Sequence, residues 1–493
     1  MPQFPAAEPH HSALPWIQLA PDAPYFLTDA GQPWTPIGQN DALTWPDLAG
    51  LFRRQNVAAV EGHLAWLAAH GVTCLRLMLE YCQTEHRYLE RPVGRFQPNM
   101  VRFWDDLFTL CERYGLRLLL TPYDTFWMSR RWRYHPYNRT QGGPCTQRTQ
   151  WLRNPGMRQA IKDRLTFATE RWGGSGALFA WDLWNEIDPV HAGKRPAALA
   201  EFVSDISAHL RAVELRCFGQ THLQTVSVFG PVLGHYPAVA EVIFRHPLLD
   251  FATTHLYDSA TIDNPKDTLG PALATGRLVR EALGEMPATR PFFDSEHGPI
   301  YTFNNWRRTL PEAFDDAYFR HMQWAHLASG GAGGGLRWPY RQPHVLTHGM
   351  RVAQRSLAAF AQLLDWPSFQ RRNLNHEVQL SNPAFAAFAC GDARQAVLWL
   401  LRQDRLITRR GTRRAPRSQV GQLTLPGLAP GSYTAYFWDT ATGQVLGQLT
   451  LLATADGLHL PLPAVGGELA VALVPVGAAF GPVVSEPPTP TYA

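Results

Sequence analysis

The sequence predicts an α/β protein, a TIM (β/α)8 barrel followed by a C-terminal antiparallel β-sandwich domain. Between residues 35 and 366, short strand-like runs alternate with longer amphipathic segments, and there are eight such runs. Strand–helix alternation is typical of parallel βαβ units, and eight units are the number that closes a barrel. The chain of 493 residues has room for a barrel of about 250 residues and for an appended domain.

The expected elements follow one another in a regular order. Strands are expected over 35–40, 72–79, 116–123, 177–184, 222–228, 250–257, 291–296 and 334–339. Amphipathic helical segments lie between them, among them 58–70, 157–172, 198–216, 271–284, 312–329 and 349–365. The glycine-rich run 330–335 predicts a tight turn before the eighth strand, because it lacks the Lys-Ser/Thr partner of a phosphate-binding loop.

The pattern changes after Trp366-Pro367. Residues 375–476 contain short alternating strands separated by turns, without helical periodicity, which is typical of an antiparallel β-sandwich. We therefore expect a catalytic barrel with an N-terminal extension over 1–370, a sandwich over 371–480 and a frayed tail over 481–493.

The composition indicates a soluble globular protein. An apolar fraction of 45% and a charged fraction of 17% fit a folded chain rather than a disordered one. The net charge of +4 is small for this length, so no nucleic-acid partner is expected. The sequence contains no apolar run of 18 or more residues, so no membrane partner is expected. The oligomeric state is left open.

Cysteine and histidine spacing predicts neither a metal site nor a cofactor. The six cysteines are scattered, without a Cys-x-x-Cys pair or zinc-ligand spacing. His10, His11, His344 and His348 have no carboxylate or cysteine partner set in the sequence. The N-terminus lacks a charged segment followed by an apolar one, so a cytoplasmic protein with reduced thiols is expected. A secreted mature form would have the same pattern.

Two glutamates stand at predicted carboxyl ends of strands, where the chemistry of TIM barrels is located. The fourth strand ends in Trp181–Glu186 (WDLWNE), and the seventh ends in Phe293–Gly298 (FDSEHG). Glycosidic cleavage needs one acid to protonate the leaving oxygen and an ionised carboxylate to meet the oxocarbenium centre. Glu186 and Glu296 are therefore candidate catalytic residues; the alternative is a structural pair bound to arginines.

The segment WDLWNE resembles the acid/base motif of clan A glycoside hydrolases, particularly the family 5 cellulases and mannanases, and FDSEHG is similar to their nucleophile motif. The resemblance extends over residues 30–366, because strand order, motif order and the separation of the two glutamates all fit. It implies a retaining β-glycosidase in which Glu186 is the general acid/base and Glu296 the nucleophile. It also implies carboxyl groups about 5–5.5 Å apart.

The resemblance implies further roles for residues near the strand ends. Asn185 would bond the sugar 2-hydroxyl, Arg76 would stabilise the ionised nucleophile, Tyr257 would hold its carboxylate, His255 would line the same wall, and Trp338 would form the platform under the sugar. One departure concerns the third strand, where family 5 members often carry a histidine. This chain has Thr121–Trp127 there (TPYDTFW), so Asp124 or Tyr123 would take its place, and the sugar is left open.

Aromatic residues add candidates for sugar binding, because indole rings pack on sugar faces. Tryptophans after strand ends are candidate subsites, namely Trp127, Trp132, Trp306 and Trp338, whereas those in helical patterns are predicted to lie in the core, namely Trp66, Trp104, Trp172 and Trp324. The long connection 124–154 either builds substrate contacts or is a surface excursion. The basic cluster 405–417 is expected to be a solvated loop, with an anionic partner or a subunit contact as the alternative.

These observations predict a retaining β-glycosidase that hydrolyses β-linked glucosides, mannosides or short oligosaccharides, with exo action and without a cofactor. A clan A hydrolase or transglycosidase for another β-sugar, such as galactose, xylose or galactofuranose, is the alternative among enzymes. The alternative from another class is a catalytically idle carbohydrate-binding protein that uses the β-sandwich as its binding module.

Overall fold

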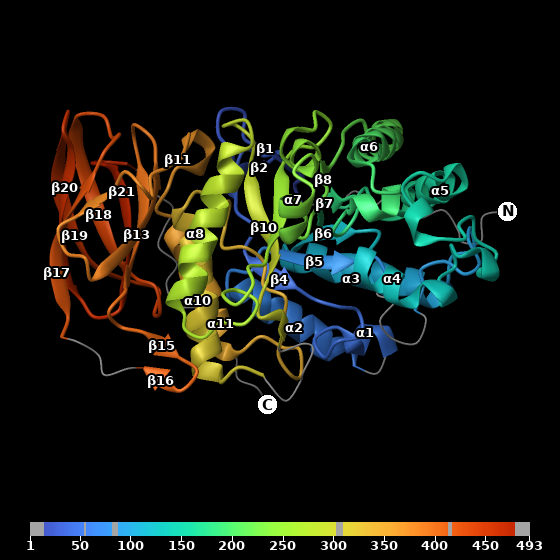
Figure 1. Ribbon diagram of the computed structural model, residues 1–493, viewed down its shortest axis with the longest axis horizontal. Coiled ribbons are helices and arrows are strands. Elements are labelled where there is room, and N and C mark those ends of the chain that lie inside the picture. The colour runs from blue at the N-terminus through green and yellow to red at the C-terminus, as the bar shows by residue number, and fades with distance from the viewer. Residues whose placement is uncertain (1–13, 54–55, 81–86, 302–308, 413–416, 479–493) are drawn as a thin grey trace.

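The computed structural model describes residues 14–53, 56–80, 87–301, 309–412 and 417–478. Parallel strands lie in the larger part of the molecule with helices around them, and an antiparallel sheet lies at one side of it (Figure 1). A small antiparallel sheet precedes the parallel strands and consists of β1 Ile17–Leu19, β2 Phe26–Thr28 and β3 Pro33–Trp34. The sequence predicts only an extension in this region.

Seven of the eight expected strands are present as parallel strands. Five of them are consecutive neighbours, β4 Gly38–Asn40, β5 Cys74–Met78, β6 Arg117–Thr121, β7 Leu178–Asp182 and β8 Leu223–Thr225. β9 Ala252–Leu256 pairs with β10 Phe292–His297. Isolated parallel bridges join Phe229 to His255, and Arg337 to both Gln39 and His297. Every residue of β5, β6, β7, β9 and β10 is buried, as expected for parallel strands covered by helices.

The eighth expected strand, 334–339, is reduced to the two bridges of Arg337. Gly335 has a φ of 75°, in the left-handed region, and Pro339 has no amide hydrogen, so only a few residues between them can pair. The glycine run before it forms the predicted turn. At Gly333, with a φ of 76°, an added Cβ would lie 2.1 Å from the Pro36 carbonyl oxygen, so the turn requires glycine there.

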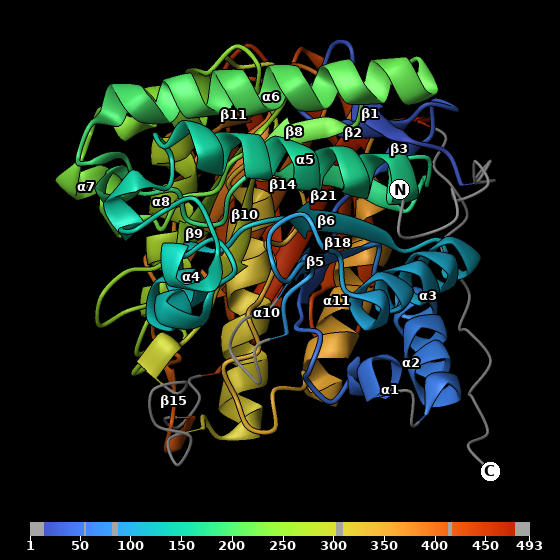
Figure 2. The ribbon, with the colours of Figure 1, turned by 90° about the vertical axis from the view of Figure 1, so that its right-hand side faces the viewer.

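Helices cover the parallel strands on their outer side (Figure 2). The long ones are α2 Val57–Ala69, α3 Pro98–Tyr114, α5 Pro155–Trp172, α6 Pro196–Phe218, α8 Leu269–Gly284, α10 Glu312–Ala328 and α11 His348–Ala361. The short ones are α1 Ala49–Arg53, α4 Thr125–Arg131, α7 Pro231–His235, η1 Trp132–Tyr134, η2 Arg139–Gln141, η3 Arg148–Gln150, η4 Pro189–Ala192, η5 Glu241–Arg245 and η7 Trp366–Ser368.

Capping residues and buried aromatic residues fix these helices. α5 begins at Pro155, because the Asn154 side chain accepts the Met157 N–H at 2.9 Å. Of the tryptophans predicted to lie in the core, Trp104, Trp172 and Trp324 are buried, whereas Trp66 is only half-buried. Among the described residues, no helix is long and apolar enough to span a lipid bilayer.

The C-terminal part is β-rich and antiparallel, as the sequence predicts. Its nine-stranded sheet has the order β11-β13-β14-β21-β18-β19-β20-β17-β12. The strands are β11 Arg372–Asn373, β12 Gln379–Leu380, β13 Phe385–Gly391, β14 Ala396–Arg402, β17 Gln419–Leu425, β18 Gly431–Asp439, β19 Gln444–Thr454, β20 Gly457–Val465 and β21 Glu468–Pro475, with a separate hairpin of β15 Ile407–Thr408 and β16 Gly411–Thr412. The sheet has its own apolar core, which includes Leu398, Leu423 and Leu460.

A continuous apolar core joins the antiparallel sheet to the rest of the protein. Trp399 and Trp438 of the sheet share it with Trp324 of α10 and Phe360 of α11. An ion pair adds to this junction, because the Arg320 guanidinium donates twice to Glu468, at 2.8 and 2.7 Å. The neighbouring charge of Arg320 keeps the pKa of Glu468 low, although burial alone would raise it.

We expect Glu468→Ala to destabilise the protein by about 3 kcal/mol, because removal of one partner leaves the largely buried Arg320 charge without compensation. Glu170→Ala is the matched control, since Glu170 pairs with Arg216 on the surface, where ion pairs contribute little. Urea denaturation checks both variants. Equal midpoints for Glu468→Ala and Glu170→Ala would show that the ion pair does not hold the junction.

Candidate active site

The structure places the two glutamates at the carboxyl ends of two parallel strands, β7 and β10, which are not adjacent to each other. Glu296 lies within β10, and Glu186 follows β7 by four residues. Glu186 has a φ of 52°, a left-handed conformation that is uncommon for residues other than glycine. Its N–H donates to the Ser227 hydroxyl at 3.2 Å, which helps to hold this conformation. Such backbone geometry is enriched at functional sites.

The carboxyl groups of Glu186 and Glu296 lie close together, and His255 lies beside both. One carboxylate oxygen of each glutamate and a nitrogen of His255 all lie within 4.8 Å of one another. His255 Nδ1 is 2.8 Å from Glu186 Oε1 and 3.7 Å from Glu296 Oε2. His255 is fully buried, and burial lowers its pKa to about 4, so the imidazole is neutral near pH 7.

Glu296 is held by a cation and a phenol. Arg76 Nη1 donates to Glu296 Oε2 at 3.1 Å, and the Tyr257 hydroxyl donates to Glu296 Oε1 at 2.8 Å. The Tyr340 hydroxyl lies 2.8 Å from the Tyr257 hydroxyl, so it can in turn donate to the phenol oxygen. The carboxylate oxygens of Glu296 are therefore fixed in position and supplied with charge-assisted hydrogen bonds.

Arg76 is the centre of a buried network. Its Nη2 donates to Asp182 Oδ2 at 2.7 Å and to Asn185 Oδ1 at 2.6 Å, and its Nη1 donates to Asn40 Oδ1 at 2.9 Å. Burial alone would lower the pKa of Arg76, but the charges of Asp182 and Glu296 raise it above its usual value. The guanidinium therefore remains charged within the site.

The two glutamates differ in their surroundings. Burial raises the pKa of Glu186 to about 7, and its carboxylate lies 2.8 Å from the neutral imidazole of His255. Burial also raises the pKa of Glu296, while the charge of Arg76 and the hydrogen bond from the Tyr257 hydroxyl oppose that effect. Glu186 can thus hold a proton near neutral pH, whereas the hydrogen bonds to Glu296 favour its ionised form.

Asn185, which accepts a hydrogen bond from Arg76, is also bonded to Asp124. Asn185 Nδ2 donates to Asp124 Oδ1 at 2.6 Å. Asp124 also caps α4, because its carboxylate accepts the N–H groups of Phe126 at 3.2 Å and Trp127 at 2.6 Å. Burial raises the pKa of Asp124 to about 6.

The predicted subsite tryptophans have different surroundings. Trp338 is buried, and its backbone N–H donates to the His297 carbonyl at 2.9 Å. Its ring packs edge-on against that of Trp45, with 5.2 Å between the ring centres. Trp127 lies in α4 beside Arg130, whose guanidinium is 5.9 Å from the ring centre. Trp132 packs against His135 and Trp151. Trp306 lies outside the described residues.

Comparison of the structure with solved structures identifies the fold. A glycoside hydrolase of family 5 from Bacteroides vulgatus ATCC 8482 is similar over 96% of this chain and 95% of its own, with a TM-score of 0.59 and 11% identity. Another structure, titled glycoside hydrolase, is similar over 95% of this chain and 99% of its own, with a TM-score of 0.58 and 12% identity. The fold is that of family 5 glycoside hydrolases. No protein-family model and no curated protein matches the sequence.

The site on this family 5 fold contains residues that the sequence analysis did not single out. Asp182 accepts hydrogen bonds from Arg76, Thr121 and the Ser227 hydroxyl, and it connects three strand ends. Tyr340 extends the hydrogen bond of Tyr257. Asp182 lies inside the WDLWNE motif and Tyr340 two residues after Trp338, so both had a positional signal. Ser227 had none, because its role depends on the spatial proximity of two strand ends.

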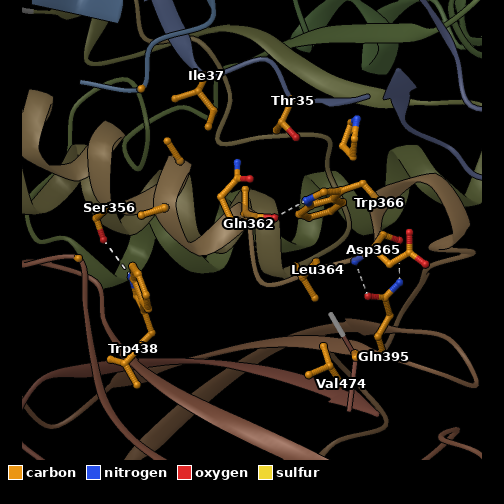
Figure 3. A pocket seen from close by; sticks show the side chains of 18 of the residues that line it. Thr35, Ile37, Ser356, Gln362, Leu364, Asp365, Trp366, Gln395, Trp438 and Val474 are labelled. Atoms are coloured by element: carbon orange, nitrogen blue, oxygen red, sulfur yellow. Dashed lines mark hydrogen bonds between the residues drawn. The ribbon is translucent and has the colours of Figure 1, made fainter. Parts of the chain in front are cut away.

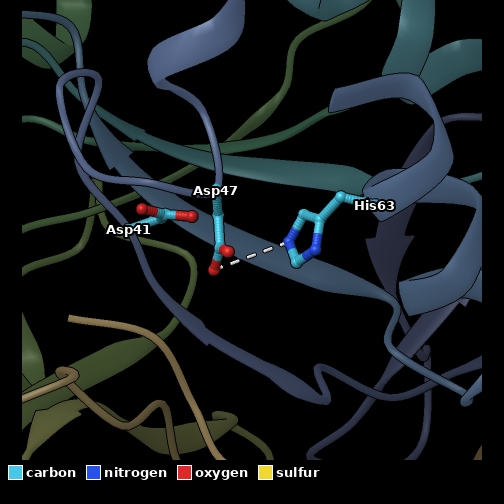
Figure 4. A group of neighbouring side chains, drawn as sticks. All are labelled: Asp41, Asp47 and His63. Carbon is cyan, nitrogen blue, oxygen red and sulfur yellow. Dashed lines mark ion pairs between the residues drawn. The ribbon is translucent and has the colours of Figure 1, made fainter. Parts of the chain in front are cut away.

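A second group of close ionisable side chains, the carboxylates of Asp41 and Asp47 and the imidazole of His63, lies beside β4 (Figure 4). His63 Nε2 is 3.7 Å from Asp47 Oδ2, and Arg351 Nη2 is 3.9 Å from the same oxygen. Burial, followed by the charge of Asp47, raises the pKa of Asp41 well above its usual range. The Arg351 guanidinium thus supplies positive charge beside these two carboxylates.

A large cleft of about 1130 Å³ lies between the carboxyl-terminal half of α11 and the antiparallel sheet, and the segment before β4 also lines it (Figure 3). Thr35 and Ile37 in its wall precede β4, so the cleft is at the opposite end of the strands from Glu186 and Glu296. Trp366 and Trp438 contribute its apolar surface. In family 5 folds, as in other TIM barrels, chemistry belongs to the carboxyl ends of the strands, so size alone does not identify the active site.

The described part of the basic cluster 405–417 is not simply solvated. Arg405 donates to the Gly466 carbonyl at 2.9 Å, and Arg409 donates to the Pro265 carbonyl at 2.7 Å. Arg409 therefore connects the hairpin of β15 and β16 to a loop after β9. The expectation of a solvated loop is wrong for these two residues, because backbone carbonyls within reach offer acceptors.

The different surroundings of the glutamates predict different titrations. Carbonyl-13C NMR of protein labelled at glutamate, with Glu186→Gln and Glu296→Gln used for assignment, should give Glu186 a midpoint near pH 7, because burial raises its pKa to about 7. A Glu186 midpoint near the ordinary value of about 4.3 would contradict the buried environment described above.

Proposed function

We propose that the protein is a retaining β-glycosidase in which Glu186 is the general acid/base and Glu296 the nucleophile. The observation that carries this proposal is the approach of the two carboxylates, with an oxygen of each within 4.8 Å. Retaining enzymes place their carboxyl groups about 5–5.5 Å apart, whereas inverting enzymes leave about 6.5–9.5 Å for a water molecule. The short approach favours direct attack by Glu296.

In the first step, protonated Glu186 donates its proton to the glycosidic oxygen as the bond from that oxygen to C1 breaks. The Glu296 carboxylate forms a covalent bond to C1, and the aglycone leaves as an alcohol. In the second step, Glu186 removes a proton from water, whose oxygen attacks C1 and releases Glu296. Arg76 and Tyr257 hold the Glu296 oxygens toward C1 throughout.

The proposal extends to the surroundings of the reaction centre. The bridges from Phe229 to His255 and from Arg337 to Gln39 and His297 support closure of the parallel strands into a (β/α)8 barrel. Trp338 forms the platform under the sugar, and Asn185 bonds its 2-hydroxyl.

β-Linked glucosides and mannosides are the substrate class, on the basis of the sequence resemblance. Exo action remains an expectation, which analysis of products from β-linked trisaccharides tests.

A panel of aryl β-glycosides assayed with the wild type, Glu186→Ala and Glu296→Ala tests the catalytic roles. We expect Glu296→Ala to be inactive, because no carboxylate remains to form the intermediate. Glu186→Ala should lose about 10²–10⁴-fold on substrates with poor leaving groups. It should be rescued by azide on substrates with a dinitrophenyl leaving group, since azide replaces the activated water.

Two results would overturn the assignment. Equal activity of the wild type and both variants would exclude catalysis by this pair. Azide rescue of Glu296→Ala with formation of the β-glycosyl azide would exchange the two roles. Glu170→Ala is the control for loss of a glutamate outside the site, because Glu170 is exposed. Glu214 is not used for this purpose, because it is buried and accepts a hydrogen bond from Trp181.

The raised pKa of Glu186 predicts the alkaline limb of the pH profile. Because the acid must be protonated, kcat/KM should fall as the pH rises through about 7, the pKa to which burial raises Glu186. In Glu186→Ala, assayed with the dinitrophenyl glycoside, this limb should disappear. A limb that persists unchanged in the variant would assign it to another group.

A further inference from the structure

The carboxylate of Asp124 is surrounded by hydrogen-bond donors. Its Oδ1 accepts Asn185 Nδ2 at 2.6 Å and the Phe126 N–H at 3.2 Å, and its Oδ2 accepts the Trp127 N–H at 2.6 Å. The side chain lies in the interior, 4% exposed. Both oxygens are thus engaged within the protein, and Asp124 stands beside the reaction centre without being directed at it.

The Asn185 amide is bonded at both ends by groups of opposite charge. Its Oδ1 accepts Arg76 Nη2 at 2.6 Å, and its Nδ2 donates to Asp124 Oδ1 at 2.6 Å. Rotation of the amide by 180° would direct NH2 at the guanidinium and oxygen at the carboxylate, and both contacts would become repulsive. Only one orientation is therefore compatible with the two partners, and it leaves one Nδ2 hydrogen for a further acceptor.

The backbone fixes the two side chains relative to each other. Asp124 and Asn185 form a parallel bridge, in which the Asn185 N–H donates to the Tyr123 carbonyl at 2.9 Å and the Thr125 N–H donates to the Asn185 carbonyl at 3.3 Å. The end of β6 is thereby joined to the segment that leads into Glu186. A change at Asp124 acts on Asn185 directly, without an intervening side chain.

We propose that Asp124 is a positioning residue that orients the Asn185 amide so that Nδ2 meets the substituent at C2 of the sugar. This inference rests on the proposed glycosidase function and refines the role of Asp124, which the sequence resemblance placed, with Tyr123 as the alternative, at the position of the family 5 histidine. Asp124 acts through Asn185, and its contribution is therefore confined to substrates that carry a hydrogen-bonding group at C2.

The test compares two substrates in four forms of the full-length enzyme: wild type, Asp124→Ser, Asn185→Ala and the double variant. Serine retains an acceptor that caps α4 but is too short to reach Asn185. The substrates are whichever of the dinitrophenyl β-glucoside and β-mannoside the wild type hydrolyses faster, and the 2-deoxy-β-glycoside, which is the 2-deoxy analogue of both sugars.

We expect Asp124→Ser to lower kcat/KM for the 2-hydroxy substrate about 10-fold or more, the effect of a lost hydrogen bond to a charged group. The value for the 2-deoxy substrate should stay close to wild type. In the Asn185→Ala background, Asp124→Ser should not further change the ratio of kcat/KM for the 2-hydroxy substrate to kcat/KM for the 2-deoxy substrate. Asn56→Ala, which removes the N-cap of α2 away from the site, should leave the ratio at its wild-type value.

Equal losses on both substrates, or an additive effect in the double variant, would overturn the proposal and leave Asp124 with a structural role. If Asp124→Ser does not fold, Asp124→Asn replaces it. The NH2 group of the new asparagine must then face one of the donors that Asp124 accepts, so the same change in the ratio of the two kcat/KM values is expected. A wild type that hydrolyses none of the glycosides overturns the proposed function, and this inference with it. Loss of the ratio effect in an active enzyme overturns the inference alone.

Discussion

The buried guanidinium of Arg76 is the interaction on which the site depends. From β5 it bonds Glu296 in β10, Asp182 in β7, and Asn185 just after β7. An uncompensated cation in this position would cost several kcal/mol. The strand ends therefore have to bring their carboxylate and amide groups to it, and the same hydrogen bonds that satisfy the cation set the positions of the groups proposed for catalysis.

The different surroundings of the two glutamates follow from this arrangement. Glu296 accepts hydrogen bonds from the Arg76 guanidinium and the Tyr257 hydroxyl, whereas Glu186 contacts the neutral His255. Burial is common to both carboxyl groups, so the difference between them comes from their partners. Two identical side chains thereby differ in the way that the proposed roles require, with a proton donor at Glu186 and a nucleophile at Glu296.

The sequence predicted features that depend on local pattern. The strands that precede Glu186 and contain Glu296 begin with apolar residues and carry polar residues toward their carboxyl ends. These polar residues come together because parallel strands end at one edge. Features that depend on contacts between distant segments were not predictable. The shortness of the eighth strand has a different, local cause, because the positive φ at Gly335 and the missing amide hydrogen of Pro339 limit its pairing to Arg337. The bond of Ser227 to Asp182 required the structure, as did the connection of Arg409 to the loop after β9.

The central claim is that Glu296 forms a covalent bond to the sugar. Incubation with dinitrophenyl 2-deoxy-2-fluoro-β-glycosides of the glucose and mannose series, followed by intact-protein and peptide mass spectrometry, tests this claim directly. We expect one fluoroglycosyl group per chain, located on the peptide that contains Glu296 and absent in Glu296→Ala. An adduct on another carboxylate, or turnover of the parent glycosides with inversion and without an adduct, would contradict it.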